Sequence, residues 1–150
     1  MKAVFDEFWS NDILMSTILA WFIAQLLKVI LVCIISKKLD FGRMIGAGGM
    51  PSSHSAFVVS LAVSVGLKMG FDSSLFAVCA CFALVVMYDA AGVRRSAGQQ
   101  AKILNQLVDS WGRGNFDDTE KRLKELLGHT PMEVLAGAVL GLMVSLIWYK

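Results

Sequence analysis

The sequence has few charged residues. They make up 17% of the 150 positions, against roughly 25% in ordinary soluble domains. Apolar residues make up 56%, above the roughly 45–50% of such domains, and the mean hydropathy is +0.62. This composition indicates a membrane protein, and the length allows one domain, residues 1–150. The net charge of +2 gives no sign of the clustered basic face that nucleic-acid binding requires, so we expect no nucleic-acid partner.

The sequence is also poor in cysteine, with Cys33, Cys79 and Cys81 as its three thiols. Each lies inside an apolar run, which favours small buried hydrophobic residues over disulfides or metal ligands. The N-terminus, MKAVFDEFWSND, lacks a basic n-region and a cleavage site, so we do not expect a signal peptide. We find no internal repeats and no low-complexity stretches in the sequence.

Four apolar runs predict an all-α integral membrane protein with about four transmembrane helices. The expected spans are residues 13–35, 55–70, 74–92 and 131–148. The first is long enough for the ~20 residues that a membrane span needs. Asp72 or Ser73 is suited to cap the third helix, and Pro131 to the first turn of the fourth.

A polar insertion, residues 93–130, separates the third and fourth spans. It carries seven basic and five acidic side chains. Its first part has an apolar stripe at helical spacing, formed by Ala101, Ile103, Leu104, Leu107 and Val108. A second short helix is expected over residues 117–128. We therefore predict a polar helical hairpin outside the bilayer or at its surface.

Positive charge predicts the orientation of the spans. Residues 36–54 and 93–130 lie on one side and hold three and seven Lys or Arg, ten in all, whereas the other side holds three. The positive-inside rule then makes these two loops cytoplasmic and both termini external. The expected location is a bacterial-type plasma membrane, with the polar residues described next facing the cytoplasm.

The spans leave a set of polar and glycine residues unexplained at this cytoplasmic face. Its members are Gln25, Lys28, Gly49, Ser52, Ser53, His54, Asp89, Arg94, Arg95, His129 and Glu133. Ionisable residues inside membrane segments are functional candidates by default. Helix N-termini bind phosphate, and glycines let backbone amides approach an anion closely. Arginine binds phosphate oxygens through bidentate hydrogen bonds. Two histidines supply a nucleophile and a proton donor. The set therefore favours a phosphate site.

Within this set, His129 and Glu133 are four residues apart at a helix start, so they can share one face. The carboxylate could then orient the imidazole, as the acid does in a catalytic triad. His54, His129 and the carboxylates match no known metal-ligand spacing, so we expect no metal and no cofactor.

Each of these residues also has a purely structural interpretation. The segment GGMPSSH could be a turn with a serine cap, and Lys28 a lysine that extends toward the membrane surface. Gln25 could bond a neighbouring helix, and Asp89 could pair with Arg94 or Arg95. Outside the set, Gly137 and Gly141 form a GxxxG pattern that indicates close helix packing, and it could also support a homo-oligomer.

Three segments, taken in order, resemble the type 2 phosphatidic acid phosphatase superfamily, which includes the vanadium haloperoxidases. They are GGMPSSHSA, YDAAGVRRSAGQQA with LNQL following, and HTPMEV. The combination looks closest to the divergent acid phosphatase/haloperoxidase-related membrane branch, and it covers about residues 11–149. The segment 51–54 resembles the central motif of the superfamily, with Ser53 where glycine is usual, and 129–141 resembles the last motif.

The resemblance implies a role for each matching residue. His129 matches the nucleophilic histidine, and Glu133 the supporting acid, here glutamate in place of aspartate. His54 matches the histidine that protonates the leaving oxygen, and Ser52 and Ser53 match the phosphate-cradling turn.

The chain departs from the superfamily pattern at its cations. Leu123 stands six residues before His129, where the superfamily has arginine, and Arg94 or Arg95 could serve instead. The lysine motif that opens the pattern is missing, and Lys28 is its expected substitute. Lys38 and Arg43 are the alternatives.

The resulting hypothesis is a metal-independent phosphatase that hydrolyses a lipid or prenyl phosphate through a phosphohistidine. Its partners would be that substrate and the membrane lipids. The alternative is a non-catalytic membrane protein that binds anionic lipid head groups or a partner through the basic segment 93–124.

Overall fold

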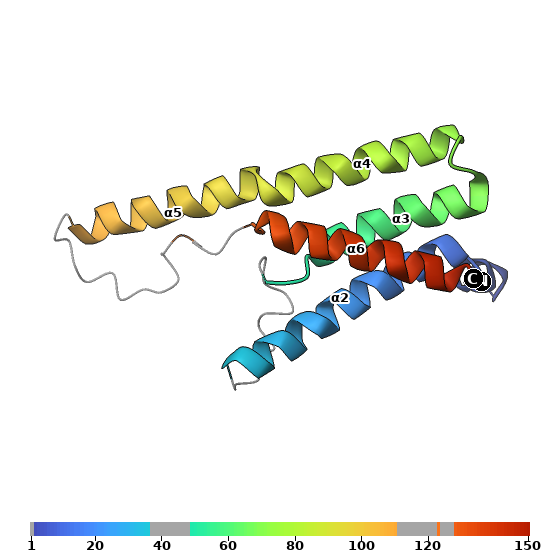
Figure 1. Ribbon diagram of the computed structural model, residues 1–150, viewed down its shortest axis with the longest axis horizontal. Coiled ribbons are helices and arrows are strands. Elements are labelled where there is room, and N and C mark those ends of the chain that lie inside the picture. Colours follow the sequence, from blue (N-terminus) through green and yellow to red (C-terminus); the bar gives the residue numbers. More distant parts are fainter. Residues whose placement is uncertain (1, 37–48, 111–122, 124–127) are drawn as a thin grey trace.

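The computed structural model describes residues 2–36, 49–110, 123 and 128–150 (Figure 1). Within these residues every regular element is a helix, which confirms the predicted all-α fold. The helices are α1 (Lys2–Trp9), α2 (Asp12–Ser36), α3 (Ser53–Met69), α4 (Ser74–Ala91), α5 (Val93–Ser110) and α6 (Pro131–Trp148).

Among the described helices, α2, α4 and α6 are long and apolar enough to cross a membrane. Helix α3 is apolar but has 17 residues, a rise of about 25 Å against a hydrocarbon core of about 30 Å. The predicted spans therefore coincide with α2, α3, α4 and α6, and α3 is the short one. Ser73 caps α4 by accepting the Phe76 N–H, and Pro131 opens α6, both as predicted.

The N-terminal helix α1 was not predicted, because eight residues are too few for a clear periodic pattern. Its Val4, Phe5, Phe8 and Trp9 are all exposed. The expectation of buried cysteines was wrong for Cys81, which is exposed, while Cys33 and Cys79 are half-buried. On a membrane helix, lipid can cover an apolar side chain such as this thiol. Its exposure therefore does not imply a disulfide or a metal ligand.

Helix α3 is the centre of the bundle and packs against α2, α4 and α6. Its contact with α6 is very close. A Cβ added at Gly137 would stand 2.2 Å from the Ser52 carbonyl oxygen, and one at Gly141 would stand 2.3 Å from that of Ala56. The GxxxG pattern is thus used for packing within the chain, and both glycines are buried there. We therefore do not propose an oligomer contact through them.

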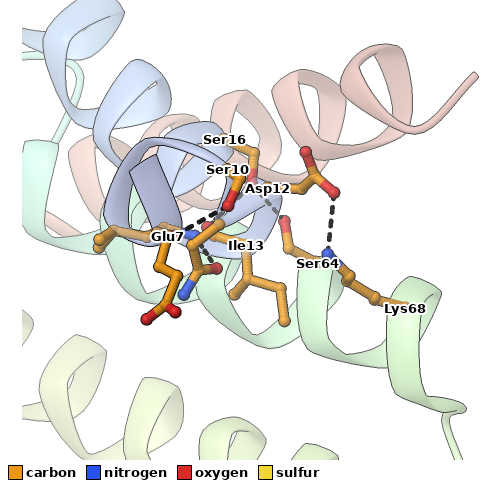
Figure 2. A network of polar contacts seen from close by, with 9 residues as sticks. Glu7, Ser10, Asp12, Ile13, Ser16, Ser64 and Lys68 are labelled. Carbon is orange, nitrogen blue, oxygen red and sulfur yellow. Dashed lines mark hydrogen bonds and ion pairs between the residues drawn. The ribbon is translucent and has the colours of Figure 1, made fainter. Parts of the chain in front are cut away.

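Buried serines join three helices in the half of the bundle remote from the histidines. Ser16 of α2 lies 2.8 Å from Ser64 of α3, and Ser145 of α6 lies 2.9 Å from Ser60 and 3.1 Å from Ser64, oxygen to oxygen. All four residues are 0% exposed. Such hydroxyl pairs between helices add packing specificity where lipid offers no hydrophobic drive. Figure 2 shows the Ser16–Ser64 end of this network beside the exposed Lys68–Asp12 ion pair.

Helix α5 follows α4 after Gly92 and extends beyond the other helices (Figure 1). It confirms the first arm of the predicted hairpin, whereas the second arm lies outside the described residues. One point of return is described: the Asn105 side chain donates to the Leu123 carbonyl at 3.0 Å and accepts the Leu123 N–H at 3.2 Å. Residue 123 is therefore held on α5.

Candidate active site at the starts of helices α3 and α6

The first turn of α6 is built by a capping box. Thr130 is the N-cap, and its hydroxyl oxygen accepts the Glu133 N–H at 3.3 Å. In return, the Glu133 carboxylate accepts the Thr130 N–H at 3.0 Å. Pro131 follows the cap, where its missing N–H costs no helical hydrogen bond. This exchange of hydrogen bonds fixes the Glu133 side chain against the helix end.

The same carboxylate oxygen contacts the imidazole of His129. Nδ1 of His129 lies 3.1 Å from Oε2 of Glu133, as the four-residue spacing predicted. A carboxylate only accepts hydrogen bonds, so this contact requires a proton on Nδ1, and in the neutral imidazole Nε2 then carries no proton. His129 is 3% exposed. Its burial and its acid partner give this imidazole a defined orientation.

Two backbone hydrogen bonds tie this turn to the neighbouring helices. The His129 N–H donates to the Ala90 carbonyl near the end of α4, and the Ser52 N–H donates to the Glu133 carbonyl, each at 2.9 Å. Segments from three regions of the sequence therefore meet at His129: the end of α4, the start of α3 and the start of α6.

His54 lies beside His129, as required if the two act on one group. The ring centroids are 6.3 Å apart and the ring planes are inclined by 57°. His54 is the second residue of α3 and is exposed, in contrast to His129. One imidazole is therefore buried and the other is exposed. The separation is compatible with one phosphoryl group reached from both rings.

The start of α3 limits which groups of the serine turn can contact an anion. The Ser52 N–H is used by Glu133, and its hydroxyl oxygen accepts the Ser55 N–H at 3.3 Å and the Ser55 hydroxyl at 3.0 Å. Ser52 is thus a cap, as its structural interpretation had it, and its amide is not available. Ser53 is buried in the first turn, where the geometry of an α-helix leaves the amides of residues 53 and 54 without an intrahelical acceptor.

Lys28 is buried in the protein, 2% exposed, and does not extend to the surface as its structural interpretation supposed. Its side chain lies along Gly49, whose ideal Cβ would be 3.4 Å from the lysine Cγ. Gly49 has a φ of +93°, which favours glycine. Lys28 and the Glu133 carboxylate attract each other electrostatically. The lysine therefore belongs to the surroundings of the histidine pair.

The remaining candidates are less well defined. Gln25 is 8% exposed and lies about one turn before Lys28 on α2, and Asp89 is half-buried next to Ala90. Arg95 is exposed at the start of α5, and the side chain of Arg94 lies outside the described residues, as do Lys38 and Arg43. No group of three or more His, Cys, Asp or Glu in the described part of the chain is placed to hold a metal ion.

Sequence reasoning missed Thr130. Its signal was present, because threonine three residues before glutamate at a helix start is the capping-box pattern. The role of the Ala90 carbonyl was also not predicted. Every residue type has a backbone carbonyl, so the sequence cannot indicate which one accepts a hydrogen bond from another segment.

The described residues thus define a helical membrane protein with two neighbouring histidines, an acid on one of them and a buried lysine close by. The family model described as "Divergent PAP2 family" matches residues 9–144, and the chain belongs to this family. It is also similar to "Uncharacterized membrane protein YuiD" of Bacillus subtilis (strain 168), with 44% identity over 151 residues, covering 94% of this chain and 96% of the relative. No solved structure matches the chain.

Proposed function

We propose that this protein is a phosphatase that hydrolyses a lipid or prenyl phosphate at the cytoplasmic membrane face through a phosphohistidine. The observation that carries the proposal is the pairing of two imidazoles 6.3 Å apart, one of which is held by a carboxylate at 3.1 Å. Binding of an anionic head group needs cations and amides but no second imidazole and no acid. Membership of the divergent PAP2 family supports the same chemistry.

In the first step, Nε2 of His129 attacks phosphorus while the bond from phosphorus to the alkoxide oxygen breaks. The proton on Nδ1 of His129 stays on the imidazole, hydrogen-bonded to the Glu133 carboxylate. The carboxylate thereby stabilises the positive charge that the imidazole gains. His54 gives its proton to the departing oxygen, so the lipid or prenyl product leaves as a neutral alcohol. Lys28 and the first amides of α3 stabilise the equatorial oxygens of the transferred phosphoryl group.

In the second step, His54 accepts a proton from water, and the oxygen of that water attacks the phosphoryl group of the phosphohistidine. The phosphorus–nitrogen bond breaks, its electron pair returns to Nε2 of His129, and inorganic phosphate leaves. His54 ends protonated and His129 neutral, as at the start. The exposed position of His54 suits this role, because water must reach it.

The experiment is phosphate release by the purified protein in detergent, with a panel of lipid and prenyl phosphates. We expect release that vanadate inhibits and that EDTA leaves unchanged. His129→Ala should abolish release, and a brief incubation of the wild type with ³²P-labelled substrate should trap an acid-labile, alkali-stable phosphoprotein. Release that persists in His129→Ala would sink the phosphohistidine route, and loss with EDTA would indicate a metal enzyme.

The same experiment separates the alternative function. A non-catalytic protein would bind vesicles with anionic lipids but release no phosphate from any member of the panel, and its binding would not depend on His54 or His129.

A further inference from the structure

We infer that Thr130 is a positioning residue that fixes the reactive tautomer of His129 by way of the Glu133 carboxylate, an inference that rests on the proposed function. Thr130 itself does not contact the His129 ring in any described interaction. Its hydroxyl accepts the Glu133 N–H at 3.3 Å, and its N–H donates to Oε2 of Glu133 at 3.0 Å.

One carboxylate oxygen of Glu133 serves both the helix cap and the histidine. Oε2 of Glu133 accepts both the Thr130 N–H and the Nδ1–H of His129, at 3.0 and 3.1 Å. The capping box and the histidine orienter are therefore one group. A change of the Glu133 rotamer would break both hydrogen bonds together, so closure of the box holds the carboxylate where the imidazole needs it.

The backbone around this oxygen is held from two sides. The His129 N–H is bound by the Ala90 carbonyl, and the Glu133 carbonyl by the Ser52 N–H. With the main chain fixed at both ends of the turn, the remaining freedom lies in the Glu133 side chain and the imidazole. Thr130 restricts the Glu133 side chain, and the Glu133 carboxylate then restricts the imidazole of His129. The consequence is a proton kept on Nδ1 and a lone pair kept on Nε2, the atom that attacks phosphorus.

The test uses Thr130→Val, which keeps the shape of the side chain and loses the acceptor, and Thr130→Ser, which keeps the hydroxyl. Because the chain has two histidines, ¹⁵N-histidine labelling in a His54→Asn background gives signals from His129 alone. We expect a fixed Nδ1–H tautomer with Thr130 and with Thr130→Ser, and averaged Nδ1 and Nε2 shifts with Thr130→Val.

Activity is measured separately with His54 in place. We expect kcat for phosphate release to fall by roughly two- to thirtyfold in Thr130→Val, the range to which loss of one helix cap corresponds. KM should change little, and Thr130→Ser should restore kcat. Ser73→Ala is the matched control, because it removes the cap of α4. It should lower stability to a similar extent and leave kcat and the His129 shifts unchanged.

A fixed tautomer in Thr130→Val, or equal loss of kcat in Thr130→Ser, would overturn the inference. So would a loss of kcat in Ser73→Ala equal to that in Thr130→Val. If Thr130→Val does not fold, Thr130→Gly replaces it, since glycine removes the hydroxyl at little cost to a helix start. The tautomer measurement needs no substrate. A wild type without phosphatase activity would therefore refute the proposed function, while the response of the His129 shifts would still decide the role of Thr130.

Discussion

Replacing Gly137 by alanine tests whether the close contact of α3 and α6 sets the geometry of the histidine pair. The added Cβ would stand 2.2 Å from the Ser52 carbonyl oxygen, and ordinary contact begins at 3.4 Å. The two helices must therefore separate by about 3.4 − 2.2 = 1.2 Å at this point. Because the opposing atom is backbone, no side-chain rotation can relieve the clash.

The displacement reaches the site directly. The Ser52 N–H holds the Glu133 carbonyl at 2.9 Å, one turn from Gly137, and His54 follows Ser52 by two residues. We expect the free energy of unfolding to fall by about 1–3 kcal/mol, as for other overpacked interiors. We expect kcat for phosphate release to fall by about a hundredfold, the loss associated with misplacement of reacting groups by roughly 1 Å.

Thermal unfolding in detergent and phosphate release, measured on the same preparations, check both numbers. Gly141→Ala requires a similar separation, about 3.4 − 2.3 = 1.1 Å, one turn further from the site. It should destabilise to the same extent but reduce kcat less than Gly137→Ala. Gly66→Ala is the control, since its Cβ would meet the ring of Phe71, a side chain that can move. Wild-type stability in Gly137→Ala, or equal losses of kcat in all three variants, would refute the reasoning.

Three further predictions concern the surroundings of the site and the remote end of the bundle. Lys28→Ala should lower the affinity for vanadate at least tenfold, whereas Lys68→Ala, which removes an exposed lysine at the other end of α3, should not; equal affinities in both variants would exclude Lys28 from the phosphate site. Gly49→Ala should lower stability by about 1–2 kcal/mol because its φ of +93° is unfavourable for alanine, and thermal unfolding measures this; an unchanged midpoint would contradict it. Burial raises the pKa of the Tyr149 phenol above its ordinary value. The fold thus favours the neutral phenol, a contribution to stability that is full below about pH 10 and is lost as pH rises through the raised pKa. Above about pH 10, the wild type should therefore lose stability relative to Tyr149→Phe. A stability difference that does not change with pH would contradict this prediction.

The helices could be predicted from the sequence because their causes are local. Apolar run length gave α2, α4 and α6 nearly to the residue, and the serine before α4 and the proline in α6 marked their starts. The contact of His129 with Glu133 was also predictable, since four residues make one helical turn. These features depend on spacing along one element.

Features that depend on contacts between helices could not be predicted in this way. Ser52 looked like part of a phosphate cradle, but its amide is taken by the carbonyl of Glu133, and only the approach of α6 decides this. Lys28 was predicted as a phosphate-binding lysine, with a lysine that extends to the surface as the alternative; the packing of α2 buries it near Gly49 and rules out that alternative. Helix α1 carried too few residues to show a period.

The absence of arginine at position 123 can be understood from the same packing. The backbone N–H and carbonyl of Leu123 both bond the side chain of Asn105. Leu123 is therefore held on α5 more than two turns beyond the start of that helix. A side chain there would not replace a cation beside His129. The helix starts of α3 and α6, however, lie together at the histidines, and each helix N-terminus carries about half a positive charge. Lys28 is buried near the same end, so we expect the two helix starts and this lysine, and not an arginine, to supply the positive charge for a phosphate. We therefore expect phosphate binding to be weakened more by Lys28→Ala than by Arg95→Ala, whose side chain is exposed. Isothermal titration with vanadate measures both, and a larger loss in Arg95→Ala would show that the helix starts and Lys28 do not suffice.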